Sequence, residues 1–213
     1  MAKTTAPLLS FGAGGAIAKT QVYASWKGIP YVRRYVIPAN PQSTGQTETR
    51  SVFTTLTQMW KNLTSDSIAP WLAFATGKPL TDRNAYLKFN VKLLRPGSDY
   101  TDYIGSAGAG GGVPLASFGA TGSSGTISTT VTAPTPPTGW SLDSVVATAR
   151  INDDPHTTTD YSIETASATA TPWEPSFSGL AAGSYVVQAW PVWDIGSGVL
   201  AYGKSLQATA TVS

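Results

Sequence analysis

The chain has 213 residues, a formal net charge of +2 and only 12% charged residues, with 21 glycines and 15 prolines. This composition is typical of a globular protein, and no apolar run approaches the ~20 residues that cross a bilayer. The absence of cysteine excludes disulfides, thiolate nucleophiles and Cys-ligated zinc.

The charge is divided unevenly along the chain. Residues 1–100 carry 12 Lys and Arg against four acids, a net +8, and residues 101–213 carry a net −6. Such a difference between halves indicates two parts with different neighbours. The N-terminal stretch "MAKTTAPLLSFGAGGAIAKT" lacks a continuous apolar segment, so we expect no signal peptide.

The first elements predicted along the chain are two strands. "TQVYASWKG" alternates apolar and polar residues, "PYVRRYVIP" is rich in β-formers, and Lys27-Gly28-Ile29-Pro30 supplies a turn between them. This pattern predicts a β-hairpin. Interleaved Trp, Tyr, Lys and Arg residues make it the candidate binding site, with the side chains either exposed to a partner or packed on the elements that follow.

Three helices follow the hairpin. Ser43 and Gln46 form a capping box ahead of a helix over 44–63, whose periodic apolar residues include Phe53 and Trp60. A second helix begins at residues 64–66 and ends at Gly77, and a third begins at Thr81 and is stopped by Pro96-Gly97. We expect these helices to close into a bundle with Phe53, Trp60, Trp71 and Phe89 in one core.

The composition then changes to Gly, Ser, Thr and Pro, which predicts a flexible linker. After it, "SLDSVVATARI", "DYSIET", "SYVVQAWPVW" and "KSLQATATVS" have the period-two pattern of strands. The element "FSGLAAGSYVVQAWPV" resembles part of fibronectin type III and other immunoglobulin-like sandwiches. We therefore predict an α+β domain of hairpin and three-helix bundle (residues 1–96), a linker (97–130) and an all-β immunoglobulin-like sandwich (131–213).

Residues for catalysis or metal binding are few. His156, the single histidine, lies in "NDDPHTTTD", where Asp153, Asp154 and Asp160 could join it in a metal site, but these residue types also favour a solvated turn. The glycine runs "GAGGAIAK" and "GAGGGVP" lack the Walker A pattern, and no serine lies in G-x-S-x-G. We expect no enzyme activity, no catalytic residues, no cofactor and no metal.

The opening motifs resemble a phage-associated family of small virion proteins. The resemblance rests on the W-K-G hairpin, on an N-P-x-S-x-x-Q-x-x-x-R-x-x-F helix start, on "LTSDSIAPW" and on N-A-Y-x-x-x-N. The matching positions are Trp26, Lys27, Gly28, Asn40, Pro41, Ser43, Gln46, Arg50, Phe53, Trp71, Asn84, Ala85, Tyr86 and Asn90. With its sandwich, the chain resembles capsid decoration proteins, in which an anchoring part grips the shell and the sandwich projects outward.

This resemblance implies a non-enzymatic bacteriophage virion structural protein, a capsid decoration or cement protein made in the bacterial cytoplasm. The implied partner is the major capsid protein or another virion protein, with a homo-oligomer on the particle and no membrane. The partner-binding candidates are Trp26, Lys27, Tyr31, Arg33, Arg34, Tyr35 and Arg50. Two alternatives stay open: a tail, neck or fibre-attachment component, and a nucleic-acid-binding protein that uses the basic hairpin.

Overall fold

The computed structural model describes residues 2–3, 14–97 and 99–213, and the chain divides into two compact units. Unit 1 is Met1–Gln42 and unit 2 is Ser43–Ser213. The boundary differs from the predicted one, which joined hairpin and helices in residues 1–96. Among the described residues, no helix is long and apolar enough to span a membrane.

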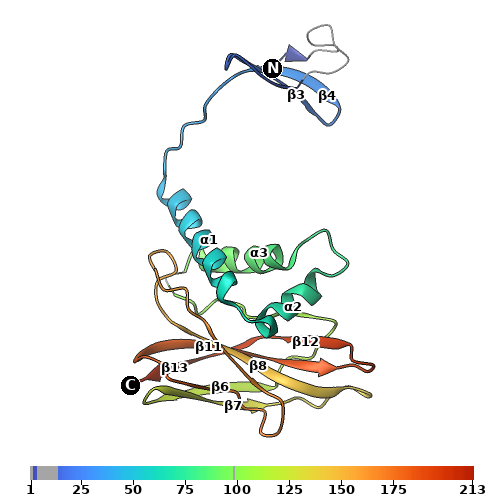
Figure 1. The fold of residues 1–213 in the computed structure, drawn as a ribbon, viewed down its shortest axis with the longest axis vertical. Coiled ribbons are helices and arrows are strands. Elements are labelled where there is room, and N and C mark those ends of the chain that lie inside the picture. Colours follow the sequence, from blue (N-terminus) through green and yellow to red (C-terminus); the bar gives the residue numbers. More distant parts are fainter. Residues whose placement is uncertain (1, 4–13, 98) are drawn as a thin grey trace. The chain divides into compact units, whose positions relative to one another are not determined.

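Unit 1 is a four-stranded antiparallel sheet in the order β1-β4-β3-β2 (Figure 1). Its strands are β1 Ala2–Lys3, β2 Gly15–Ile17, β3 Gln21–Trp26 and β4 Ile29–Arg34. The predicted hairpin is confirmed as β3 and β4, and two further short strands extend it. Residues 36–42, which follow the sheet, form no helix or strand and are all exposed.

Unit 2 begins with the three predicted helices, α1 Thr44–Asn62, α2 Ser65–Ala75 and α3 Asp82–Leu94. Ser43 is the N-cap of α1, although its side chain makes no capping hydrogen bond. Thr81 caps α3, where its hydroxyl accepts a hydrogen bond from the Asn84 amide at 3.2 Å. The helix periodicity in the sequence therefore predicted these elements to within one or two residues.

The remaining strands of unit 2 form two antiparallel sheets. One has the order β10-β7-β6 and the other the order β5-β12-β11-β8-β9, with β13 also paired to β11. The bounds are β5 Ala107–Ala109, β6 Ser117–Ser123, β7 Thr126–Thr132, β8 Ser141–Ile151, β9 Glu164–Ala168, β10 Ser176–Ser178, β11 Gly183–Asp194, β12 Leu200–Lys204 and β13 Leu206–Val212.

Unit 2 has three layers, in which the helices cover one face of the larger sheet and the smaller sheet covers the other (Figure 1). One core lies between the sheets and joins Ile127 and Phe177 to Val145 and Val187. The central strands β8 and β11 are buried on both faces, so their sequences read as nearly continuous apolar runs. The period-two pattern predicted β8, β11, β13 and the start of β9, but it predicted neither the remaining strands of unit 2 nor this second covering layer.

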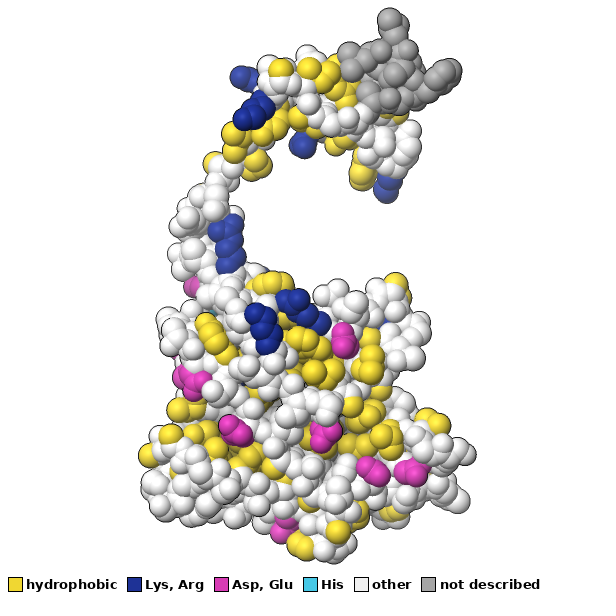
Figure 2. All heavy atoms as spheres, viewed as in Figure 1, with side chains coloured by type: hydrophobic (Ala, Val, Ile, Leu, Met, Phe, Trp, Pro, Cys, Tyr) yellow, Lys and Arg dark blue, Asp and Glu magenta, His cyan; other side chains and the backbone are white. Residues whose placement is uncertain are grey.

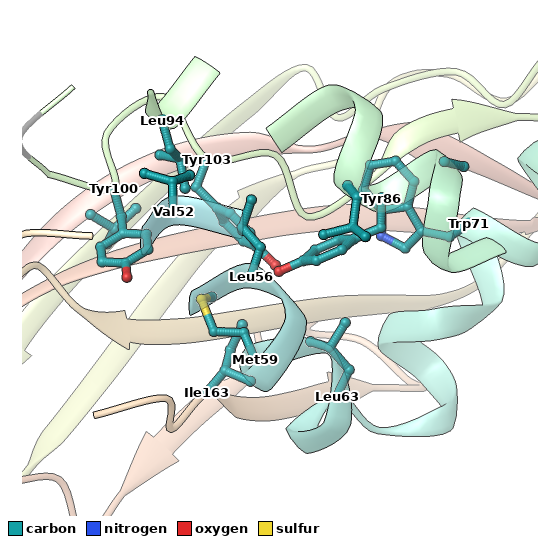
Figure 3. Packing of buried hydrophobic residues seen from close by; sticks show 13 residues of the cluster. Val52, Leu56, Met59, Leu63, Trp71, Tyr86, Leu94, Tyr100, Tyr103 and Ile163 are labelled. Atoms are coloured by element: carbon teal, nitrogen blue, oxygen red, sulfur yellow. The ribbon is translucent and has the colours of Figure 1, made fainter. Parts of the chain in front are cut away.

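The helices do not close into a bundle of their own. Their core joins Leu56, Met59, Trp71 and Tyr86 to Ile163 and to Val186 of the larger sheet, as Figure 3 shows for part of the cluster. Trp60 and Phe89 pack on its edge. Phe53, predicted in this core, is instead 48% exposed. The neighbouring Val52 is buried in its place, one residue further round the helix towards the core.

The predicted flexible linker at residues 97–130 is not found, because this segment contains β5, β6 and part of β7. Asn90 of α3 binds both backbone groups of Ile104, at 2.8 and 3.1 Å, and the Gly105 amide donates to Gln188 Oε1 at 2.6 Å. A side chain at Gly105 would come within 2.6 Å of the Trp190 ring. Glycine serves close packing here, a role that composition alone cannot distinguish from flexibility.

Candidate functional site

The candidate site lies on the β3–β4 hairpin of unit 1. A two-residue turn joins the strands, and Lys27 and Gly28 both have positive φ, 50° and 76°. This is the arrangement of a type I′ turn, whose twist matches that of the strands. The predicted four-residue turn is therefore shorter, and Ile29 and Pro30 belong to β4.

The strand register divides the candidate residues between two faces of the sheet. Trp26 is opposite Ile29, Ala24 opposite Tyr31, and Val22 opposite Arg33, and cross-strand partners share a face. The Lys27 Nζ lies 4.9 Å from the centre of the Trp26 ring. We call the face with Trp26, Ile29, Tyr31 and Arg33 the aromatic face.

The remaining candidates lie elsewhere. Arg34 pairs with Gln21 and therefore lies on the opposite face, together with Tyr23 and Val32. Tyr35 follows β4, and its amide donates to the Thr20 carbonyl at 2.8 Å. Arg50 is on α1 in unit 2, outside the hairpin. The prediction that Arg33 and Arg34 point to opposite faces is confirmed, and sequence reasoning missed Ile29 because it was assigned to the turn.

Within unit 1, the described residues leave the aromatic face accessible. None of the described residues 14–42 is buried, and Trp26 is 66% exposed. Within unit 1, the Trp26 ring is therefore accessible on the face that carries Tyr31 and Arg33.

Unit 1 is also purely basic. Residues 1–42 contain five Lys and Arg and no Asp or Glu. Figure 2 shows Lys and Arg atoms over unit 1 and over the helices of unit 2, and Asp and Glu atoms mainly over the β layers. A basic surface with exposed aromatic rings is complementary to an acidic partner.

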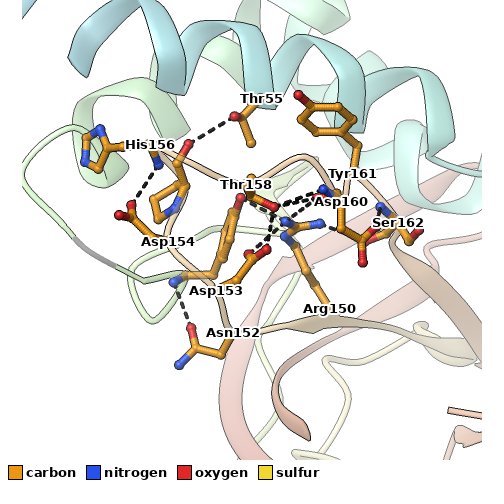
Figure 4. Close-up of polar contacts among 12 residues, drawn as sticks. Thr55, Arg150, Asn152, Asp153, Asp154, His156, Thr158, Asp160, Tyr161 and Ser162 are labelled. Atoms are coloured by element: carbon orange, nitrogen blue, oxygen red, sulfur yellow. Dashed lines mark hydrogen bonds and ion pairs between the residues drawn. The ribbon is translucent and has the colours of Figure 1, made fainter. Parts of the chain in front are cut away.

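The loop with the single histidine is held by a buried arginine rather than arranged around a metal. Arg150 of β8 is 3% exposed and donates to Asp153 Oδ1 at 3.0 Å, to the Asp160 carbonyl at 2.7 Å and to the Ser162 carbonyl at 2.9 Å (Figure 4). Its guanidinium also lies 4.2 Å from the centre of the Tyr100 ring and donates to its hydroxyl. Sequence reasoning missed this role, although a lone Arg in an apolar strand is a signal for a buried pair.

The four residues of the possible metal site each have another partner. Asp153 binds Arg150 and Thr158, Asp154 accepts from the His156 amide at 2.8 Å, and His156 Nε2 is 2.8 Å from the Gly97 carbonyl. The Ser162 amide donates to Asp160 and lowers the pKa of that carboxyl. Over the described residues, no group of three or more His, Asp or Glu is arranged to hold a metal.

The same loop connects the helices to the larger sheet. The Thr55 hydroxyl donates to the Pro155 carbonyl at 3.0 Å, and Asn62 donates to the Tyr161 carbonyl at 2.9 Å. The predicted solvated turn is thus a fixed element of unit 2, and its polar groups serve the packing of α1.

Comparison with known proteins places the chain in a sequence family without assigning it an activity. A search of proteins with curated functions found no similar sequence. Residues 14–153 match a family described as a family of unknown function, DUF6266. The match covers the strands β2 to β4, the three helices and the strands up to β8. Since it spans more than half of the chain, the protein belongs to the DUF6266 family.

Proposed function

We propose that this protein is a non-enzymatic structural component of a larger assembly, and that unit 1 attaches it there through the aromatic face. The observation that carries the proposal is the basic sheet of unit 1: five cations and no acid in residues 1–42, no buried side chain in the described residues 14–42, and Trp26, Tyr31 and Arg33 on one face. Trp, Tyr and Arg are the residues that contribute most to binding energy at protein interfaces.

The partner surface in this proposal is acidic. Two copies of unit 1 facing each other would bring two groups of five cations together, which opposes a symmetric contact through this face. A heterologous contact with an acidic protein surface has no such cost. The proposal therefore favours attachment to another protein over self-association of unit 1.

The setting we propose is a bacteriophage particle, with the protein as a capsid decoration or cement protein. The support is the resemblance of the hairpin and helix motifs to phage-associated virion proteins, together with the division into two units. The finer assignment of the two sheets of unit 2 as an immunoglobulin-like sandwich belongs to the same proposal and is supported by the core between them. A tail, neck or fibre-attachment position is the alternative within this setting.

A nucleic-acid-binding function is the second candidate, favoured by the interleaving of Tyr and Trp with Lys and Arg on the hairpin. The two functions differ in their response to salt. Binding to nucleic acid weakens steeply with salt, because each neutralised phosphate releases a counterion. Binding through Trp and Tyr anchors is less sensitive to salt, because apolar burial supplies much of its energy.

The test uses particles assembled in cells that produce either the wild-type protein or a variant, purified on a density gradient. Wild-type protein is expected on the particles in a fixed copy number. Trp26→Ala and Arg33→Ser should reduce that copy number at least tenfold, the equivalent of about 1.4 kcal/mol. Arg34→Ser is the matched control, since it removes the same charge from the opposite face.

Two outcomes would contradict the proposal. Equal loss in Arg33→Ser and Arg34→Ser, accompanied by salt-sensitive retention of the wild-type protein on DNA, would favour nucleic-acid binding. Absence of the wild-type protein from purified particles would reject the virion setting.

A further inference from the structure

Unit 2 has a groove between α1 and α3, separate from the sheet of unit 1. Its volume is about 650 Å³, and it is lined by Thr49, Phe53, Leu87, Lys88, Val91, Lys92, Arg95 and Pro96. Among the described residues, no acidic side chain lines it. The groove thus combines two features, an apolar floor and a basic rim.

The floor is formed by Phe53, which lies outside the helical core, by Leu87, which is buried in that core, and by Val91, which packs against it. Val52, Leu56 and Met59 are the α1 residues buried in the helical core, and this leaves Phe53 beside them, 48% exposed. Leu87 and Val91 are one turn apart on α3 and line the same groove. An exposed phenylalanine at the edge of an apolar groove is a place for a large apolar side chain of another molecule.

The rim is a single stripe of cations. Lys88, Lys92 and Arg95 are four and three residues apart and therefore lie on one side of α3 and its C-terminal end. No carboxylate of the described residues lines the groove or forms an ion pair with Lys88, Lys92 or Arg95. Like charges at this spacing repel one another, and an anionic ligand would relieve that repulsion.

We propose that this groove binds an acidic peptide segment of another protein, one that carries a large apolar side chain between its carboxylates. The apolar side chain packs on Phe53 and Val91, and the carboxylates pair with Lys88, Lys92 and Arg95. This mode of recognition uses an apolar anchor for affinity and charge for orientation.

Other occupants fit the groove less well. A nucleic-acid strand would use the three cations but would leave the apolar floor against sugar and phosphate groups. A symmetric dimer through the groove would place two cationic stripes together. The groove lies wholly within unit 2, so this proposal does not depend on the attachment proposed for unit 1.

The test measures fluorescence anisotropy of the full-length protein with short labelled probes. The first probe is a glutamate-rich peptide with one central tryptophan. The second peptide has serine in place of the tryptophan, and the third has lysine in place of glutamate. The fourth probe is a thymidine oligonucleotide. The first peptide is expected to bind at least about tenfold more tightly than each of the others.

Substitutions in the groove test whether the peptide binds there. Phe53→Ser and the double variant Lys88→Ser, Lys92→Ser should each weaken binding of the first peptide at least about tenfold. The control double variant Lys61→Ser, Arg83→Ser removes the same charge from exposed positions of α1 and α3 outside the groove and should bind as the wild type does. Trp26→Ala should also leave binding unchanged, which separates this result from any failure of the unit 1 proposal. Thermal melting verifies that each variant is folded.

Three results would overturn the proposal. The first is no detectable binding of the tryptophan peptide, and the second is equal binding of the serine peptide, which would exclude an apolar anchor. The third is an oligonucleotide that binds as tightly as the peptide and loses affinity in the Lys88 and Lys92 variant, which would make the groove a nucleic-acid surface.

Discussion

Substitution of Gly122 by alanine tests whether the glycine-rich segment is packed or flexible. Gly122 of β6 lies against β13, and a Cβ atom there would fall on the carbonyl group of Thr211 and within 3.1 Å of its amide nitrogen. β13 cannot easily withdraw, because it pairs with β11 from Leu206 to Val212. Alanine must therefore push two strands of different sheets apart.

The expected cost follows from the nature of the clash. Overpacking a core costs about 1–3 kcal/mol, and a clash with backbone atoms belongs at the upper end of that range. For a unit of this size each 1 kcal/mol lowers Tm by about 2–4 °C, so Gly122→Ala should melt about 6–12 °C below the wild type. Urea unfolding should show a lower midpoint with an unchanged m-value.

A matched substitution at Gly45 completes the experiment. Gly45 is on α1, and a Cβ atom there would have no neighbour within 4 Å. Gly45→Ala should therefore be neutral or stabilise the protein by up to about 1 kcal/mol. Unchanged melting of Gly122→Ala would refute the packed arrangement and restore the flexible linker.

Three further predictions concern the core, the unit boundary and the buried arginine. Trp71→Ala should destabilise unit 2 by about 3–5 kcal/mol, whereas Phe53→Ala should cost less than about 1 kcal/mol, as measured by urea unfolding. Limited proteolysis should cut first within residues 36–42 and should spare residues 105–130, as mass spectrometry of the fragments will show. Arg150→Met should cost about 3–5 kcal/mol in thermal unfolding, because it removes the cation paired with Asp153 and leaves the Ser162 carbonyl without this donor.

A specific result would contradict each of these three predictions. Equal destabilisation by the Trp71 and Phe53 substitutions would mean that α1 is rotated relative to the structure. Early cleavage within residues 105–130 with a surviving C-terminal fragment would support an independent sandwich. An Arg150→Met protein as stable as the wild type would show that apolar packing replaces the ion pair without loss.

The sequence pattern predicted the positions of the helices well, but it predicted poorly which elements pack against one another. The apolar spacing in α1 includes both Val52 and Phe53, and only the position of the sheet decides which is buried. Similarly, Gly105 and Gly122 lie in a segment that has the composition of a linker. Their role in packing depends on Trp190 and Thr211, which are distant from them in the sequence. Which residue is buried and which glycine is closely packed depends on tertiary contacts, and a short stretch of sequence does not contain them.

The arrangement of the candidate residues on the hairpin could be predicted from the sequence, whereas their role in binding stays a prediction. Alternation along β3 and β4 was sufficient to separate Arg33 from Arg34, because a strand sends successive side chains to opposite faces. The groove on α3 was missed, although Lys88 and Lys92 have helical spacing in the sequence. Its apolar floor depends on Phe53 being exposed, and the sequence predicted the opposite.

The central position of β11 has a consequence for biosynthesis. Residues 183–194 are synthesised well after the three helices, yet they contact the helical core, the smaller sheet and three neighbouring strands. At about 5–20 residues per second, the helices emerge several seconds before the strand that covers their apolar side. During that interval the helices expose apolar surface that invites aggregation, and the core of unit 2 can be completed only after β11 has emerged.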